Sequence, residues 1–73
     1  MTDLTERQKD VARLVAEGWC DKDIGRQLGI SYNTVRVHIV ALAFRLGLDE
    51  ERSARVQIAR WWWDHPVERE QAA

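Results

Sequence analysis

The sequence predicts an all-α fold of four helices in a single domain of 73 residues. Ser, Thr and Asp residues precede several apolar patterns as helix start signals, and glycines follow these patterns as stop signals. The clearest segment runs from Ser31, which can cap a helix start, to Gly47, which can close a helix end. Apolar side chains recur between them at helical spacing, at Val35, Ile39, Leu42 and Leu46. We expect the rest of the chain to be arranged around this helix.

A first helix is expected near the start of the chain. Thr5 and Gln8 match a capping box, in which each side chain bonds the backbone amide of the other residue. The helix should run from about Glu6 to Glu17, with Gly18 closing it.

A second, shorter helix is expected just before the long one. Asp21 can serve as the N-cap of a helix over about residues 22–28, which Gly29 would end. Only Gly29 and Ile30 then separate this helix from Ser31. Two helices joined by so tight a turn form a helix-turn-helix arrangement, in which the second helix is the one presented to DNA.

A fourth helix is expected from about Glu50 to Trp63. The acidic residues 49–51 suit a helix start, because the helix dipole favours negative charge there. Pro66 cannot continue a helix and restricts the residue before it, so the helix should end before His65. We therefore expect residues 1–64 to form the domain and residues 65–73 a mobile tail.

The sequence argues against several classes of protein. No apolar run approaches the roughly 20 residues that span a bilayer, and the N-terminus lacks a signal peptide pattern, so we expect a cytoplasmic protein. Acidic residues flank the tryptophan run 61–63, which argues against membrane binding. Cys20 is the only cysteine, so neither a disulfide framework nor a metal-ligand cluster is expected, and we predict a buried or half-buried thiol. The sequence offers no catalytic pair and no phosphate loop, so we predict no enzyme activity, no cofactor and no small-molecule substrate.

Charge is distributed unevenly along the chain. The net charge is −1, which is low for a nucleic-acid binder. Residues 24–48, however, contain no Asp or Glu, and Arg26, Arg36 and Arg45 give this segment a charge of +3, which leaves −4 for the remainder. A local basic patch on an acidic body can still contact phosphates, although few of them.

Five short motifs follow one another along residues 4–60. They are Leu-Thr at 4–5, Ala-Glu-Gly at 16–18, Asp-Lys-Asp-Ile at 21–24, Ile-Ser at 30–31 and Thr-Val-Arg-Val-His at 34–38. With these motifs the chain resembles the LuxR/GerE-type helix-turn-helix domain. The resemblance implies a four-helix DNA-binding domain of bacterial or phage transcription regulators, often dimeric through the fourth helix. Because only three residues precede the first motif, the chain looks like a stand-alone member of the family.

The resemblance also implies which residues contact DNA. Arg36 and Val37 match family positions that reach base edges, where an arginine can donate to guanine and a valine can pack on a thymine methyl group. Lys22 and Thr34 match positions near the phosphates, whereas His38 matches a position that packs against the scaffold. The residues expected to contact double-stranded DNA are Lys22, Arg26, Tyr32, Asn33, Thr34, Arg36, Val37, Val40 and Arg45.

The outward face of the third helix departs from the family pattern. At about 100° per residue, the side opposite the apolar stripe holds Asn33, Val37, Val40, Ala41 and Phe44. Relatives usually place polar or basic residues at positions 40, 41 and 44. Three interpretations remain open. The face docks another protein, such as a regulator or a polymerase subunit; Val40 and Phe44 make apolar contacts at the groove edge; or the face packs against a second copy of the chain.

The tryptophan run 61–63 predicts an interface. Consecutive positions on a helix differ by about 100°, so one core cannot bury all the rings and at least one should be exposed. One interpretation is that Trp63 and a neighbouring ring cap the core. The other is an interaction surface, because tryptophan is enriched at binding hot spots, and the partner is then a second copy or a regulatory protein. The residues expected at this interface are Arg55, Ile58, Trp61, Trp62 and Phe44.

Overall fold

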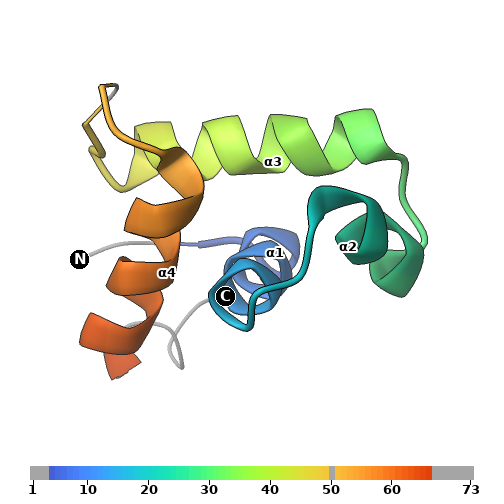
Figure 1. Cartoon of the computed structure of the whole chain (residues 1–73), viewed down its shortest axis with the longest axis horizontal. Coiled ribbons are helices and arrows are strands. Elements are labelled where there is room, and N and C mark those ends of the chain that lie inside the picture. Colours follow the sequence, from blue (N-terminus) through green and yellow to red (C-terminus); the bar gives the residue numbers. More distant parts are fainter. Residues whose placement is uncertain (1–3, 50, 67–73) are drawn as a thin grey trace.

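The computed structural model describes residues 4–49 and 51–66 and confirms an all-α fold (Figure 1). Four helices are present: α1 (Glu6–Ala16), α2 (Asp21–Leu28), α3 (Tyr32–Arg45) and α4 (Ala54–Asp64). No strand occurs within the two described ranges. Most of the tail expected over residues 65–73, from position 67 onward, lies outside the described residues. The division into a domain and a tail therefore stays a prediction.

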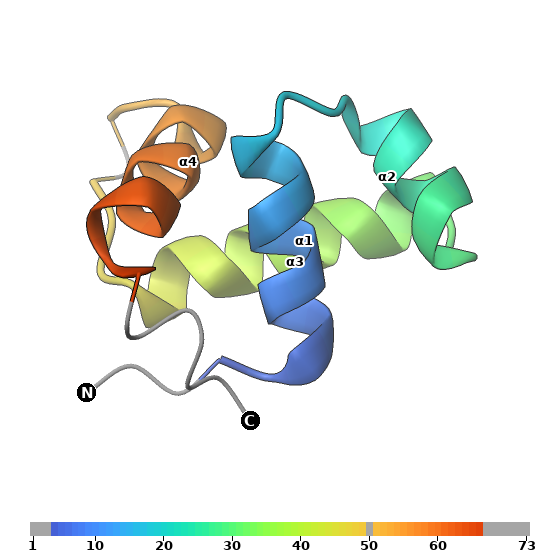
Figure 2. The same ribbon diagram turned by 90° about the horizontal axis from the view of Figure 1, so that it is seen from below.

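The long helix α3 lies along one side of the molecule, across the other helices (Figure 1). Seen from below, α1 runs between α4 and α2, with α3 behind them (Figure 2). α1 packs against each of the other helices, and α3 also packs against α2 and α4. One face of α3 is consequently left without a neighbouring helix.

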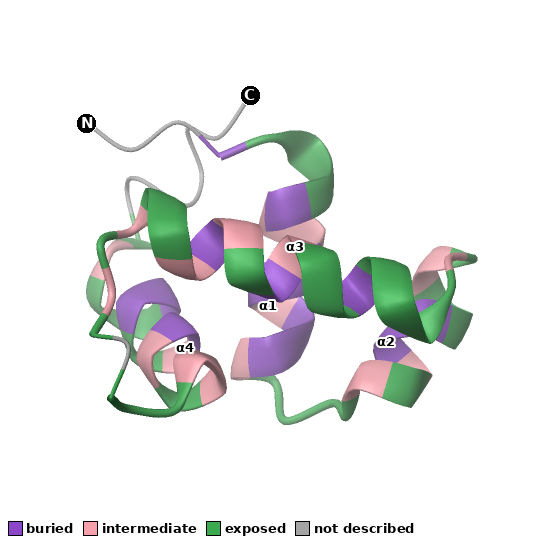
Figure 3. Ribbon diagram, turned by 90° about the horizontal axis from the view of Figure 1, so that it is seen from above, coloured by how far each residue is buried: buried purple, intermediate pink, exposed green. Residues whose placement is uncertain are grey.

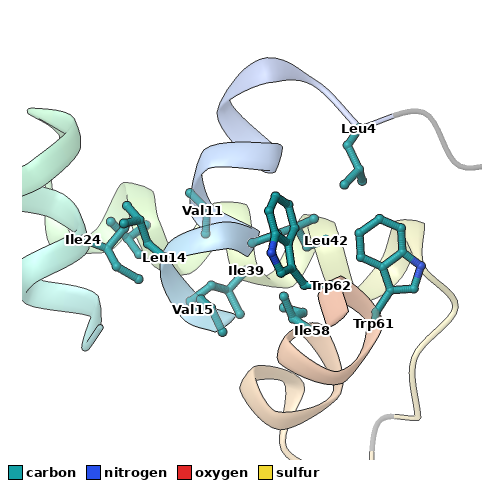
Figure 4. Close-up of a cluster of buried hydrophobic side chains, with 12 residues drawn as sticks. Leu4, Val11, Leu14, Val15, Ile24, Ile39, Leu42, Ile58, Trp61 and Trp62 are labelled. Atoms are coloured by element: carbon teal, nitrogen blue, oxygen red, sulfur yellow. The ribbon is translucent and has the colours of Figure 1, made fainter. Parts of the chain in front are cut away.

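The buried core joins all four helices (Figure 4). Val35, Ile39 and Leu42 of the stripe predicted on α3 are buried, and Leu46 packs half-buried at its end. The remaining buried apolar residues come from the chain start, α1, α2 and α4: Leu4, Val11, Ala12, Leu14, Val15, Ile24, Ile58, Trp61 and Trp62. The stripe that the sequence predicted is therefore the side of α3 that holds it to the scaffold.

The predicted caps of α1 and α3 are confirmed. The Gln8 amide donates to the Thr5 hydroxyl at 3.1 Å, and the Thr5 amide donates to the Gln8 side-chain oxygen at 3.1 Å. The Ser31 hydroxyl accepts from the Thr34 amide at 3.1 Å. Gly47 follows α3 with a φ of 65°, in the left-handed region where glycine is favoured. Local chemistry alone thus sets the start of α1 and both ends of α3.

The N-cap expected for α2 is wrong. Asp21 is the first residue of the helix, and Cys20 is the N-cap, without a side-chain hydrogen bond to the helix. The Asp21 carboxylate instead accepts a hydrogen bond from Arg55, whose guanidinium also donates to the Trp19 carbonyl. The side chain that could have capped α2 therefore ties the loop between α1 and α2 to α4. The Cys20 thiol is exposed, contrary to the prediction.

The start expected for α4 is also wrong. The helix begins at Ala54 rather than near position 50, and Ser53 caps it with a bond of 3.4 Å from the Val56 amide. The Gln57 side chain accepts from the Asp49 amide at 2.9 Å and donates to the Asp49 carbonyl at 2.8 Å. These bonds hold the Asp49 backbone in a turn, so the acidic segment forms a loop. The predicted end before His65 is confirmed.

Candidate nucleic-acid interface

The outward face of α3 carries a row of exposed apolar side chains, visible as the largely exposed helix in Figure 3. Val37 and Val40 are 65% and 68% exposed, and Phe44 is 89% exposed, whereas Ala41 is half-buried. The first three are spaced three and four residues apart, so they lie along one line of the helix. We call Val37, Val40 and Phe44 the apolar row. The apolar outward face predicted for this helix is therefore present.

Arg36 is held in place by Tyr32, one turn earlier on α3. The Arg36 Nη1 donates to the Tyr32 hydroxyl oxygen at 3.0 Å, and the guanidinium carbon lies 5.7 Å from the Tyr32 ring centroid. This hydrogen bond raises the pKa of Arg36 above its ordinary value, so the side chain stays charged at physiological pH. The remaining N–H groups of an oriented guanidinium can meet a guanine edge or a phosphate.

The start of α2 lies beside the start of α3. Lys22 is exposed and lines the same shallow hollow as Tyr32, together with Asp21 and Arg55. Asn33 and Thr34 in the first turn of α3 are also exposed, although the Thr34 hydroxyl lies 2.8 Å from the Ser31 hydroxyl and takes part in the helix cap. The polar residues predicted to contact DNA thus gather where α2 and α3 begin.

Two carboxylates weaken the basic character of this surface. Asp23 lies 3.6 Å from the Arg26 guanidinium, and Asp21 acts on the charge of Arg36. The side chains of Arg26 and Asp23 are 75% and 50% exposed, so their pairing contributes little and a phosphate can replace it. Arg45 stands exposed at the far end of α3, nine residues after Arg36. The charge of +3 counted along residues 24–48 is therefore partly offset by acids just upstream of that segment.

Gly25 sets how closely α2 approaches the turn before α3, and the sequence analysis missed it. A Cβ at this buried position would lie 2.8 Å from the Ile30 carbonyl oxygen and 3.6 Å from a methyl group of Val35. The Ile30 amide donates to the Gly25 carbonyl at 2.9 Å. Only glycine allows this contact between two backbones. A glycine inside an expected helix, just before a tight turn, was the available signal.

The expected interface on α4 is mostly wrong. Ile58, Trp61 and Trp62 are 0%, 9% and 6% exposed and pack in the core (Figure 4). Arg55 is engaged with Asp21 and the Trp19 carbonyl inside the same chain. Four of the five residues named for that interface are thus structural, because α4 turns Ile58 and the first two tryptophans inward. Phe44 alone remains exposed.

The exposed tryptophan of the run is Trp63, which is 58% exposed on α4. The expectation that one ring of the run cannot be buried is confirmed, whereas the interpretation that Trp63 caps the core is wrong. Val56, seven residues earlier on the same helix, is 66% exposed. Ala59 lies between them and is half-buried. These residues form one line along the outer side of α4.

Other kinds of site are not evident in the part of the chain that the structure describes. Within residues 4–49 and 51–66, no group of His, Cys, Asp or Glu side chains is arranged to hold a metal ion. None of the described helices has the length and apolar character needed to cross a membrane. His38 is half-buried on the flank of α3, consistent with a scaffold position.

A short helix followed by a tight turn and an exposed, partly basic helix defines a helix-turn-helix protein. The chain belongs to the LuxR family of bacterial regulatory proteins, also described as GerE, whose family model matches residues 2–61. The match spans all four helices except the last residues of α4.

The relatives are named as regulators of transcription. The chain is 42% identical over 55 residues to a Mycobacterium bovis protein assigned as an HTH-type transcriptional regulator, 38% identical over 61 residues to the transcriptional regulatory protein UhpA of Escherichia coli, and 36% identical over 58 residues to the Escherichia coli nitrate/nitrite response regulator protein NarL. These matches cover 75%, 84% and 80% of the chain. They cover only 6%, 29% and 25% of the relatives, so the similarity is to one part of much longer proteins.

Proposed function

We propose that this protein binds double-stranded DNA through the exposed face of α3 and regulates transcription in the cytoplasm of a bacterium. The observation that carries the proposal is the clustering of Arg36, Tyr32 and Lys22 where α2 and α3 begin, on the side of α3 that no other helix covers. Membership of a regulatory family and the names of the relatives support it.

In this proposal α3 enters the major groove with its first turns against the base edges. Arg36 donates to O6 and N7 of a guanine, and Tyr32 keeps the guanidinium oriented before DNA arrives. Lys22, Arg26 and Arg45 contact phosphates, which fixes the position of the helix without reading sequence. Asn33 and Thr34 lie close enough to the helix start to add polar contacts.

The test is binding to mixed genomic DNA fragments across a salt series, with the variant Arg36→Ala. Arg60→Ala is the matched control, because Arg60 is an exposed arginine on α4. We expect Arg36→Ala to weaken binding by about five- to 150-fold and to remove the preference among fragments, as for the loss of a base contact. Arg60→Ala should bind as the native protein does. No binding at low salt by the folded protein would overturn the proposal.

A second candidate function is docking of a transcription protein on the apolar row. Phe44, at 89% exposure, favours it, because a large contiguous apolar surface more often marks a protein interface than a nucleic-acid contact. The double variant Val40→Lys, Phe44→Arg separates the two functions. Unchanged DNA binding together with loss of a captured protein partner would support docking. Loss of DNA binding with no partner captured by either protein would count against it.

We further propose that the protein forms a homodimer through α4. The surface is the outer line of Val56, Ala59 and Trp63, which replaces the buried residues named from the sequence. We expect sedimentation at high micromolar concentration to show a dimer that Trp63→Ala weakens while the circular dichroism spectrum stays native. A native protein that remains monomeric at that concentration would contradict this.

A further inference from the structure

We propose that Val37 and Val40 select thymine, by packing against the methyl groups of two neighbouring thymines in the major groove. The inference rests on the DNA-binding function proposed above and specifies the bases that the site takes. It concerns the middle of α3, where the exposed surface is formed by aliphatic side chains between the polar first turn and Arg45.

The spacing of the two valines fits neighbouring base pairs. They are three residues apart on α3, which corresponds to about 4.5 Å along the helix axis. Successive bases on one strand are separated by about 3.4 Å. Both side chains point away from the scaffold, at 65% and 68% exposure. When α3 lies in the groove, each valine can therefore face its own base.

The chemistry of the major groove leaves thymine as the fitting base. Guanine, adenine and cytosine present hydrogen-bond donors or acceptors there, whereas thymine adds an apolar C5 methyl group. A valine cannot satisfy a polar base edge, and burying that edge against it leaves the polar group unpaired. A thymine methyl group gains instead from burial against the valine. The two valines would thus disfavour G·C pairs as much as they favour thymine.

Arg36 and Phe44 have other parts in this arrangement. Arg36 precedes Val37 and supplies hydrogen-bond donors, so a guanine beside the thymines is the expected neighbour. Phe44 lies in the last turn of α3, about 10 Å along the axis from Val37. Base contacts are made mainly from the first part of a recognition helix, so we assign no base to Phe44.

The experiment removes only the methyl group from the DNA. Duplexes are first selected by the native protein from a random-sequence pool, and each conserved thymine is then replaced by deoxyuridine, which keeps the same hydrogen-bonding groups. We expect selected duplexes to contain adjacent thymines, and each replacement to weaken binding about fourfold, the effect of burying one methyl-sized group. Affinity is measured by fluorescence anisotropy at one fixed salt concentration.

Variants of the chain show which side chains detect the methyl groups. Val37→Thr and Val40→Thr keep the shape of valine but add a hydroxyl, and both positions are exposed, so the fold should be retained. Each should bind its thymine and deoxyuridine duplexes within about twofold of one another. Arg36→Ala should bind more weakly and still distinguish the two duplexes.

Two results would overturn the inference, and they differ in what they mean for the proposed function. Equal binding of thymine and deoxyuridine duplexes by the native protein would reject methyl recognition and leave DNA binding intact. No selection of any duplex would reject both, and would favour a protein partner on the apolar row.

Discussion

At the scale of single residues, Gly25 controls the geometry of the helix-turn-helix. The backbone of α2 at this residue lies so close to the Ile30 carbonyl that a Cβ would sit 2.8 Å from the oxygen. Because the obstacle is backbone rather than a flexible side chain, Gly25→Ala must move α2 away from the turn. We expect a loss of about 1–3 kcal/mol in the free energy of unfolding, typical of overpacking. Urea denaturation measures it, with Gln27→Ala, at an exposed position of α2, as the control that should change little.

The contact between Asp21 and Arg55 joins residues 34 positions apart in the chain. Their side chains are 19% and 35% exposed, and Arg55 also donates to the Trp19 carbonyl. A double-mutant cycle with Asp21→Ala and Arg55→Ala should give a coupling energy of about 0.5–3 kcal/mol. The same cycle on Asp23 and Arg26, which are far more exposed, should give about 0–1 kcal/mol. Equal coupling in the two pairs would contradict a structural role for the Asp21–Arg55 contact.

At the scale of helices, α4 depends on which tryptophan faces the core. Trp62 is 6% exposed and packs near Ile58 and Leu42, whereas Trp63 is 58% exposed (Figure 4). Trp62→Ala should lower the free energy of unfolding by about 3–5 kcal/mol, as for other large-to-small core changes. A domain of this size has a total stability of about 4–11 kcal/mol, so this variant should be close to unfolded.

Trp63→Ala is the matched control on the neighbouring residue. It removes the same atoms from a largely exposed position, and thermal unfolding should show a far smaller change than with Trp62→Ala. If the two variants lost similar stability, the orientation of α4 described here would be wrong.

How much of the fold the sequence could predict differs between helices for physical reasons. The Thr5–Gln8 capping box and the Ser31 cap act within four residues, so local patterns were sufficient for α1 and α3. The start of α4 depends on Gln57 holding Asp49, eight residues away, which competes with the helix-start signal of the acidic segment.

The candidate site was predictable in the same uneven way. The apolar row on α3 follows from helical periodicity once the buried stripe is known, and its exposure is confirmed for Val37, Val40 and Phe44. Periodicity also indicated that one tryptophan of the run must be exposed. Which one is set by how α4 packs on α1 and α3, and no local pattern encodes this packing.

At the scale of the whole molecule, the supply of positive charge limits how the protein can bind DNA. The net charge is −1, and the basic side chains proposed to meet phosphates are Lys22, Arg26 and Arg45. Each phosphate contact releases counterions and contributes about −0.9 to the slope of log K against log salt concentration. One protein molecule should therefore give a slope near −3, which is shallow for a sequence-specific regulator.

The salt slope also reports whether the bound species is a dimer. If two copies bind together through α4, the phosphate contacts double and the slope should approach about −5 to −6. Trp63→Ala, which weakens the proposed dimer without removing any contact to DNA, should return it to about −3 at protein concentrations where the variant is monomeric. Fluorescence anisotropy over a range of salt, combined with sedimentation of the same samples, measures both quantities. A steep slope that Trp63→Ala leaves unchanged would mean that one chain carries more phosphate contacts than these three residues, and that α4 has no part in binding.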